Sequence, residues 1–196
     1  MGYLRYKILI LVITASLALF AARPALEQIV ISPQRDYFTE FWVLGSYHNA
    51  TYPSDVVAGQ NYRLYLDTSN HLGQCAYYVI EIKFCNDSRL APDSLKRTNS
   101  NQPSLGNITF FAADEETVEI PVNFSIDYKI NNASIDVQSV VINGEKLSTN
   151  GISVPWTESK GGFYGNLFFE LWILNSTTNS LQYHQRYLSL WLNLKI

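Results

Sequence analysis

Charged side chains are scarce in this sequence of 196 residues. Asp, Glu, Lys and Arg together make up 16% of it, and the formal net charge is −3. Such a chain lacks the basic patches with which proteins bind nucleic acids or anionic membranes, so we expect no nucleic-acid partner. The solubility of its surface must come from neutral polar residues, and a surface of that kind loses few ion pairs on acidification.

Catalytic and metal-binding motifs are also missing. The three histidines, His48, His71 and His184, form no recognisable ligand set with one another or with the cysteines. There is no Gly-x-Ser-x-Gly, no phosphate-binding loop and no His-Glu-x-x-His. The acidic turn at residues 114–116 is better explained as a solvated hairpin end than as a cation site. We therefore predict no catalytic residues, metal ions or cofactors; a surface enzyme acting on glycans is the remote alternative.

Only two cysteines are present, Cys75 and Cys85. The residues between them have the pattern of one continuous strand. Ten steps along a strand cover about 33 Å, whereas a disulfide needs Cα atoms within about 7 Å of each other. We therefore expect no disulfide within the chain, and each cysteine is predicted to be a free thiol or to form an intermolecular bond.

One long apolar run is present, near the N-terminus. Arg5 and Lys7 precede an uninterrupted apolar or small stretch at residues 8–22, which Arg23 and Pro24 end. This length suits a signal peptide and falls short of the roughly 20 residues needed to span a membrane. Residues 1–24 are therefore predicted to be a helical signal peptide or signal anchor. Length favours cleavage, but a retained membrane tether stays open, and in both cases the rest of the chain is expected outside the cell.

Six Asn-x-Ser/Thr triplets follow the apolar run, and none has Pro in the middle. The predicted N-glycosylation sites are Asn49, Asn86, Asn107, Asn123, Asn132 and Asn175. Glycan transfer takes place outside the cytoplasm, which agrees with the predicted export. The alternative is that a chain rich in Asn and Ser contains such triplets by chance.

Beyond Pro24, short alternating segments separated by turns predict β-structure, and no segment has a convincing helical period. We predict an all-β domain at residues 37–196, an Ig-like antiparallel β-sandwich of seven to nine strands. Its clearest local feature is a hairpin, with strands at residues 61–67 and 78–84 around a turn at 68–73. The polar segment at residues 85–105 is predicted to be an interaction loop or a glycan platform.

A short β-prone segment precedes this domain. Residues 25–36 are predicted to form an extended N-terminal arm, in which Leu26, Ile29, Val30 and Ile31 point to both sides and require burial on both. The arm is either the first strand of its own sandwich or a strand donated to another subunit. The pattern does not distinguish these two possibilities.

Several motifs resemble an uncharacterised family of archaeal surface domains that are usually membrane-anchored. They are the aromatic-Thr-Glu-Phe strand at residues 37–45, Tyr-Pro at 52–53, the Asn-His-x-Gly turn at 70–73 and the Leu-x-Leu-Trp strand at 188–193. The chain departs from the family in Leu72, where an acidic residue is usual, in its two cysteines and in its single N-terminal apolar segment. The resemblance implies an extracellular β-domain and carries over no catalytic residue.

The organisation of the chain is similar to that of an archaeal thread-filament subunit, with a signal, a short arm, one glycosylated sandwich and no C-terminal anchor. This resemblance implies that the arm of one subunit completes the sheet of the next, as in donor-strand pili. We therefore expect a structural protein of the cell surface that assembles head to tail with copies of itself into a pilus-like filament. The alternative is a membrane-tethered extracellular module with a binding or accessory role.

Overall fold

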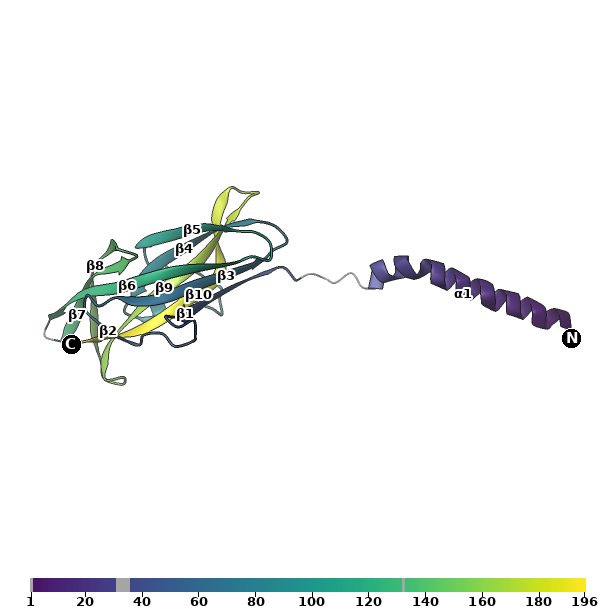
Figure 1. Cartoon of the computed structure of the whole chain (residues 1–196). Coiled ribbons are helices and arrows are strands. Elements are labelled where there is room, and N and C mark those ends of the chain that lie inside the picture. Colours follow the sequence, from purple (N-terminus) through teal and green to yellow (C-terminus); the bar gives the residue numbers. More distant parts are fainter. Residues whose placement is uncertain (1, 31–35, 132) are drawn as a thin grey trace. The chain divides into compact units, whose positions relative to one another are not determined.

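The structure is a computed structural model that describes residues 2–30, 36–131 and 133–196. The chain divides into two compact units, Met1–Asp36 and Tyr37–Ile196. The first unit contains the helix α1, Gly2–Val30, and the second consists mainly of β-strands (Figure 1). The prediction of a mostly β protein with one N-terminal apolar helix is confirmed.

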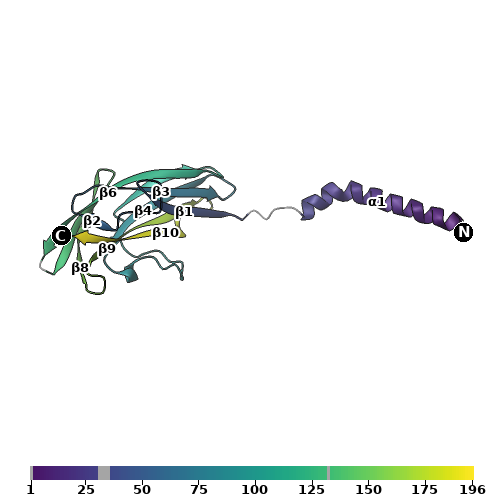
Figure 2. The same cartoon turned by 60° about the horizontal axis from the view of Figure 1, so that its bottom comes forward.

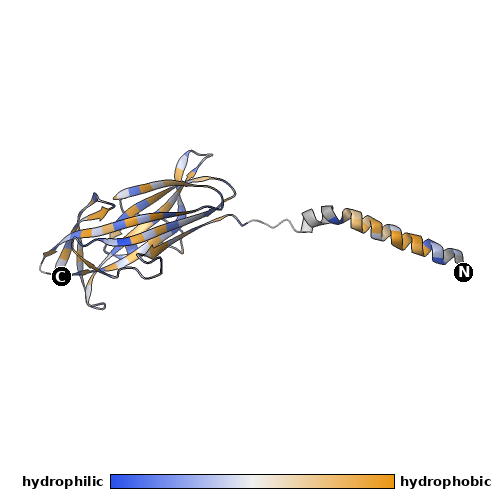
Figure 3. Cartoon of the chain, in the orientation of Figure 1, coloured by the Kyte–Doolittle hydropathy of each residue, from blue (hydrophilic) through white to orange (hydrophobic). Residues whose placement is uncertain are grey.

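Helix α1 contains a continuous apolar stretch, which is orange in Figure 3, whereas colours alternate along the strands. Its segment Arg5–Arg23 is exposed, and its 19 residues are long and apolar enough to cross a membrane. A signal sequence has the same properties, so α1 is consistent with a signal peptide.

Residues 25–30, which belong to the predicted extended arm, are helical in the full-length chain. These residues, with Leu26, Ile29 and Val30 among them, continue α1 as helix, and Ile31 lies outside the described residues. Adding a residue to an existing helix is far easier than starting one. Ala25, Leu26, Glu27 and Gln28 are also good helix formers, so the apolar helix extends past Pro24.

The second unit contains ten strands and one 3₁₀ turn among the described residues. The strands are β1 Phe38–Gly45, β2 Asp55–Val57, β3 Tyr62–His71, β4 Ala76–Cys85, β5 Gly106–Ala112, β6 Thr117–Asn131, β7 Ser134–Ile142, β8 Glu145–Thr157, β9 Gly162–Asn175 and β10 Ser180–Lys195. The turn η1, Ser88–Leu90, lies in the segment between β4 and β5.

The strands pair in two groups, β1-β3-β6-β7-β8 and β5-β4-β9-β10-β2. The groups join where the end of β8 pairs with the start of β9, so that one mixed sheet curls on itself. All pairs are antiparallel except β2 with β10, which is parallel. The predicted count of seven to nine antiparallel strands is therefore too low. The sequence pattern gave no sign of β2, because three residues are too few to show alternation.

The predicted hairpin of residues 61–84 is wrong. Strand β3 pairs with β1 and β6, whereas β4 pairs with β5 and β9, so the turn between them crosses from one group to the other. Alternation correctly indicated that Leu64 and Leu66 of β3, and Ile80 and Ile82 of β4, face the core. Alternation specifies which side chains are buried but does not specify which strand lies alongside.

The core lies between the two groups, where buried side chains from both form one cluster. Leu66 and Phe124 from the first group and Phe84 and Phe169 from the second are almost completely buried. On β9, Gly165 allows the ring of Phe84 to approach the backbone, because a Cβ atom at that position would collide with the ring.

Candidate functional site

Two strand edges face each other along one side of the β-domain. Strands β1 and β10 lie side by side in both views (Figures 1 and 2). Strand β1 pairs only with β3, and the free edge of β10 pairs with β2 only at residues 193–195. Among the described residues, no backbone pairing joins β1 to β10. We call this unpaired boundary the β1–β10 seam; exposed strand edges of this kind can accept a further strand.

A chain of buried side-chain hydrogen bonds closes one end of the seam. Asn70 Nδ2 donates to three backbone carbonyls, so its Oδ1 must be the acceptor for Tyr78 OH at 3.2 Å. Tyr78 OH then accepts from Thr39 Oγ1 at 3.0 Å, and Thr39 Oγ1 accepts from His184 Nε2 at 2.8 Å. Because each hydroxyl has one proton to give, the order of donors requires the proton of His184 to be on Nε2.

The environment of the seam keeps this chain uncharged. Burial lowers the pKa of His184, and the nearby charge of Arg186 lowers it further. Burial raises the pKa of Tyr78, so its hydroxyl stays protonated. A β-bulge interrupts the β9–β10 register between Tyr183 and Arg186, and Gln185 within it has a positive φ of 58°. Bulges re-aim side chains, and here the bulge places His184 against Thr39 of the other group of strands.

The seam also exposes apolar surface. Phe41 and Val43 of β1 and Leu188 of β10 pack against the core but are only partly buried. A pocket of about 330 Å³ beside the hydrogen-bond chain is lined by residues that include Tyr37, Leu72 and Arg186. In the donor order given above, His184 Nε2 donates to the Thr39 hydroxyl and so is not free to act as a base toward it.

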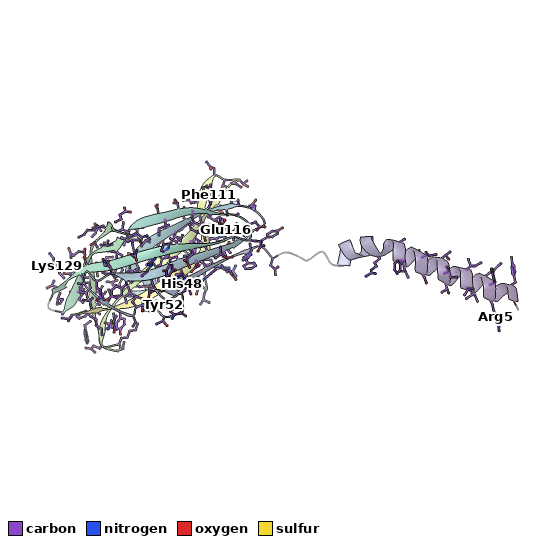
Figure 4. All side chains as sticks on the ribbon, viewed as in Figure 1. Arg5, His48, Tyr52, Phe111, Glu116 and Lys129 are labelled. Carbon is purple, nitrogen blue, oxygen red and sulfur yellow. The ribbon has the colours of Figure 1, made fainter. Side chains whose placement is uncertain are left out.

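A second cluster lies on the outer face of the first group of strands. Asp67 of β3 and Glu119 of β6 are directly opposite each other. Burial, and then the charge of Glu119, raise the pKa of Asp67. His48, labelled in Figure 4 in the loop after β1, lies 3.1 Å from Glu119 and stacks on the ring of Tyr65. The sequence did not predict this cluster, because strand pairing and a loop bring its members together.

A third cluster is buried between β4 and β9. Lys83 Nζ lies 2.8 Å from Glu170 Oε2, and the two side chains are 3% and 0% exposed. Burial and the charge of Glu170 raise the pKa of Tyr183. A usable signal was present in the sequence, because Glu170 is the one charged residue in the apolar strand β9, and Lys83 lies within the mostly apolar strand β4. No group of three or more His, Cys, Asp and Glu side chains suited to a metal occurs in the described part of the chain.

The segment at residues 85–105, predicted as an interaction loop or glycan platform, covers this third cluster. The backbone N–H of Ser100 donates to Glu170 Oε1 at 2.6 Å, and Ser100 itself is buried. A pocket of about 230 Å³ within the loop is lined by polar side chains that include Arg89, Asp93 and Lys96. The inner side of the loop therefore has a structural role.

Three of the predicted glycosylation sites have exposed side chains. Asn49 lies in the loop after β1, Asn107 at the start of β5, and Asn123 on the outer face of β6. Figure 4 shows Phe111, also exposed, on the same strand as Asn107. Glycans at these three positions require no change in the surrounding structure.

Two other predicted glycosylation sites are less accessible. Asn86 and Asn175 are half-buried, and their Nδ2 atoms donate to Ser153 O at 2.7 Å and to Gln182 Oε1 at 3.2 Å. A glycan attaches to that same nitrogen, so we expect lower occupancy at these two positions. Asn132 lies outside the described residues.

The two cysteines are free thiols at opposite ends of β4. Cys75 is exposed, whereas Cys85 is buried, and its Sγ donates to Asp87 O at 3.3 Å. Burial raises the pKa of the Cys85 thiol. Of the two, only Cys75 is accessible for the intermolecular bond that the sequence left open.

No protein-family model matches the chain, and no curated protein matches it either. Among solved structures, the chain is similar to a β-glucosidase from Listeria innocua, in complexes with gluconolactone and with glucose. Each alignment has a TM-score of 0.36 and covers 80% of this chain, at 9% and 8% identity. The chain spans only 16% of the length of the β-glucosidase. A similarity at this level carries no argument about the fold or the activity of this protein.

Proposed function

We propose that the protein is an exported, N-glycosylated structural protein of the cell surface, and that it joins copies of itself by strand addition at the β1–β10 seam. The observation that supports this function best is the pair of facing strand edges without backbone pairing between them, on strands that carry partly buried apolar side chains. Main-chain hydrogen bonds would supply affinity, and alternate side chains would fill the apolar surface. We further propose that the two groups of strands act as an Ig-like sandwich, supported by their shared core.

The donated strand is the arm at residues 25–36 of another copy. In the full chain, residues 25–30 are helical as the continuation of α1. Cleavage after residue 24 would leave a helical stretch of only six residues, well below the roughly 12–15 that an isolated helix needs. Ile29, Val30 and Ile31 are β-branched and favour a strand. Removal of the signal would therefore convert this segment from helix to donor strand.

The arrangement of glycosylation sites supports contact through a narrow region. Asn49, Asn107 and Asn123 lie exposed on a loop and on two strands of different groups. Glycans at these positions would hinder broad side-by-side association, but they would leave room for one extended strand. A head-to-tail contact of this kind repeats into a filament when it does not close on itself.

Deletion of residues 25–32 tests this proposal in the secreted protein. We expect filaments to disappear in electron microscopy, while the domain stays soluble and somewhat less stable. A matched pair of variants tests the apolar side chains of the arm without shortening the chain. Val30→Ser should weaken assembly, whereas Gln28→Ser should leave it unchanged. Filaments of normal abundance after the deletion would refute the donor role of the arm.

A second candidate function is a membrane-tethered extracellular module with a binding or accessory role. The exposed apolar segment Arg5–Arg23 favours it, because this segment is long enough to span a membrane if it is retained. The intact mass of the mature protein distinguishes the two functions. A mature N-terminus near residue 25 supports the filament subunit, and an intact α1 in the membrane fraction supports the tethered module.

A further inference from the structure

The buried Lys83 has an unusual set of partners. It lies on the face of β4 opposite the core, 3% exposed, with its Nζ 2.8 Å from Glu170 Oε2 and 3.0 Å from Glu81 Oε2. Its Nζ also donates to the carbonyl of Ser100 at 3.2 Å. The three N–H bonds therefore point at three protein oxygens. The amine is held between two carboxylates, one on the adjacent strand and one on its own.

The surroundings of this pair exclude water. Glu170 and Phe168 on β9 are completely buried. The ring of Trp172 lies 6.0 Å from Lys83 Nζ, and its Nε1 is buried without a hydrogen-bond partner among the described residues. The loop above is held in place by Ser100, whose Oγ donates to Leu90 O. Charged groups in such a site are costly to maintain.

We propose that Lys83 and Glu170 condense to form an isopeptide bond. Lys83 Nζ first passes one proton to Glu81, and the neutral amine attacks Cδ of Glu170. A second proton then moves from Nζ to Glu170 Oε2. Glu81 returns the first proton to the same oxygen, the Cδ–Oε2 bond breaks, and Oε2 leaves as water. An ammonium and a carboxylate thus become an amide and one water molecule. Glu81 ends in its starting form, and the step needs no oxidant, reductant or cofactor.

The geometry of the site assists each part of this reaction. The Nζ atom is in contact with the carboxylate it attacks, and well-oriented intramolecular reactions reach effective molarities of roughly 10⁵–10⁸ M. The Ser100 N–H, 2.6 Å from Glu170 Oε1, stabilises the negative charge that develops on this oxygen. The product is a neutral amide, so the reaction removes two buried charges.

Glu170, and not Glu81, is the reacting carboxyl. Glu170 is completely buried on the neighbouring strand, and both of its oxygens are held by hydrogen bonds. Glu81 lies two residues from Lys83 on the same strand, and its side chain is 27% exposed. Contact with solvent suits Glu81 to proton transfer. The resulting bond would join β4 to β9 covalently.

The intact mass of the full chain, produced in a host without N-glycosylation, tests the proposal directly. We expect the folded protein to be lighter than its sequence by the mass of one water molecule. After unfolding and digestion, trypsin should fail to cut after Lys83, and one cross-linked peptide should contain both Lys83 and Glu170. A folded wild-type protein of full mass, or a cross-link to Glu81, would overturn the assignment.

Variants separate the two groups that form the bond from Glu81, which transfers the proton. Lys83→Met and Glu170→Met should each have the full mass of their sequence, whereas the control Lys146→Met, which alters an exposed ion pair with Asp127, should keep the loss of one water. Glu81→Gln retains both reacting groups and should slow bond formation about 10²–10⁴-fold after refolding. Bond formation at the wild-type rate in Glu81→Gln would remove its proton-transfer role. The wild-type mass decides the main question even if a variant fails to fold.

Discussion

The two buried polar networks of the β-domain hold different kinds of strand neighbours together. In the β1–β10 seam, a chain of neutral hydrogen bonds runs from His184 through Thr39 to Tyr78 and connects strands that no backbone pairing joins. Between β4 and β9, the ion pair of Lys83 and Glu170 lies on strands that are already fully paired. A neutral hydrogen bond contributes about 1 kcal/mol net, whereas an unpaired buried charge costs several times more. We therefore expect the seam to separate at a lower free-energy cost than the β4–β9 contact.

The largest effect should come from breaking the charged network. Lys83→Met leaves Glu170 buried without its partner and also removes the proposed covalent bond between β4 and β9, so we expect the free energy of unfolding to fall by at least about 3–5 kcal/mol. The matched Lys146→Met, on an exposed ion pair, should change it by less than about 0.5 kcal/mol. Denaturant titration of both variants measures the difference. Equal losses of unfolding free energy in the two variants would show that the buried pair contributes no more to stability than the exposed one.

Breaking the neutral network should cost less. Thr39→Val removes the hydroxyl that joins His184 to Tyr78 and leaves both without that partner, so we expect a loss of about 1–3 kcal/mol. Thr109→Val, at an exposed position of β5, serves as the control in protein made without N-glycosylation. Hydrogen exchange should show faster opening of β1 and β10 in Thr39→Val, with β4 and β9 unchanged. If β4 and β9 opened equally fast, the two networks would not be independent.

The pH dependence of the seam should be smaller still. Burial lowers the pKa of His184 in the folded protein. Below the ordinary value of about 6.5, the unfolded chain binds a proton that the folded chain resists. Stability is therefore complete above that pH and decreases as the pH falls toward the lowered pKa of the folded state. His184→Gln keeps a donor for Thr39 but does not titrate, so thermal unfolding across this range should depend less on pH.

His48→Gln is the control for this measurement, because it removes a histidine outside the seam; the charge of His48 lowers the pKa of Asp67, so this variant should change only the contribution of Asp67. Asp67 acts in the opposite direction. Its pKa is raised in the folded state, so its charge costs stability at neutral pH, and protonation relieves that cost as the pH falls through the raised value. A wild-type slope retained in His184→Gln would mean that another group controls the pH response.

The smallest effect concerns the two cysteines near the ends of β4, whose reactivity can be compared without a change in the stability of the protein. A thiol reagent should label exposed Cys75 rapidly in the folded protein. It should label Cys85 only on unfolding, because that thiol is buried and its pKa is raised. Mass spectrometry of labelled peptides, with and without denaturant, measures both rates. Rapid labelling of Cys85 in the native protein would show that the loop covering this end of the sheet opens readily.

Local pattern predicted much of the fold but little of the candidate sites. Alternating side chains correctly indicated that Leu64, Leu66 and Ile80 face a core. The same pattern led to the wrong hairpin, because it has no information on pairing. Lys83 and Glu170 are 87 residues apart, and Thr39 and His184 are 145 apart. Only the register of β4 with β9 and the approach of β1 to β10 bring these residues together.

The sequence by itself determined the apolar N-terminal helix, the predominance of β-structure and the positions of the glycosylation triplets. These features depend on neighbouring residues, through hydrophobic periodicity and short-range chemistry. The tertiary structure decided that β3 and β4 belong to different groups, and that β1 and β10 lie side by side without backbone pairing among the described residues. It also decided that Lys83 and Glu170, on two mostly apolar strands, become a buried pair. The reason is the same in each case: burial and pairing depend on which segments the whole chain brings together.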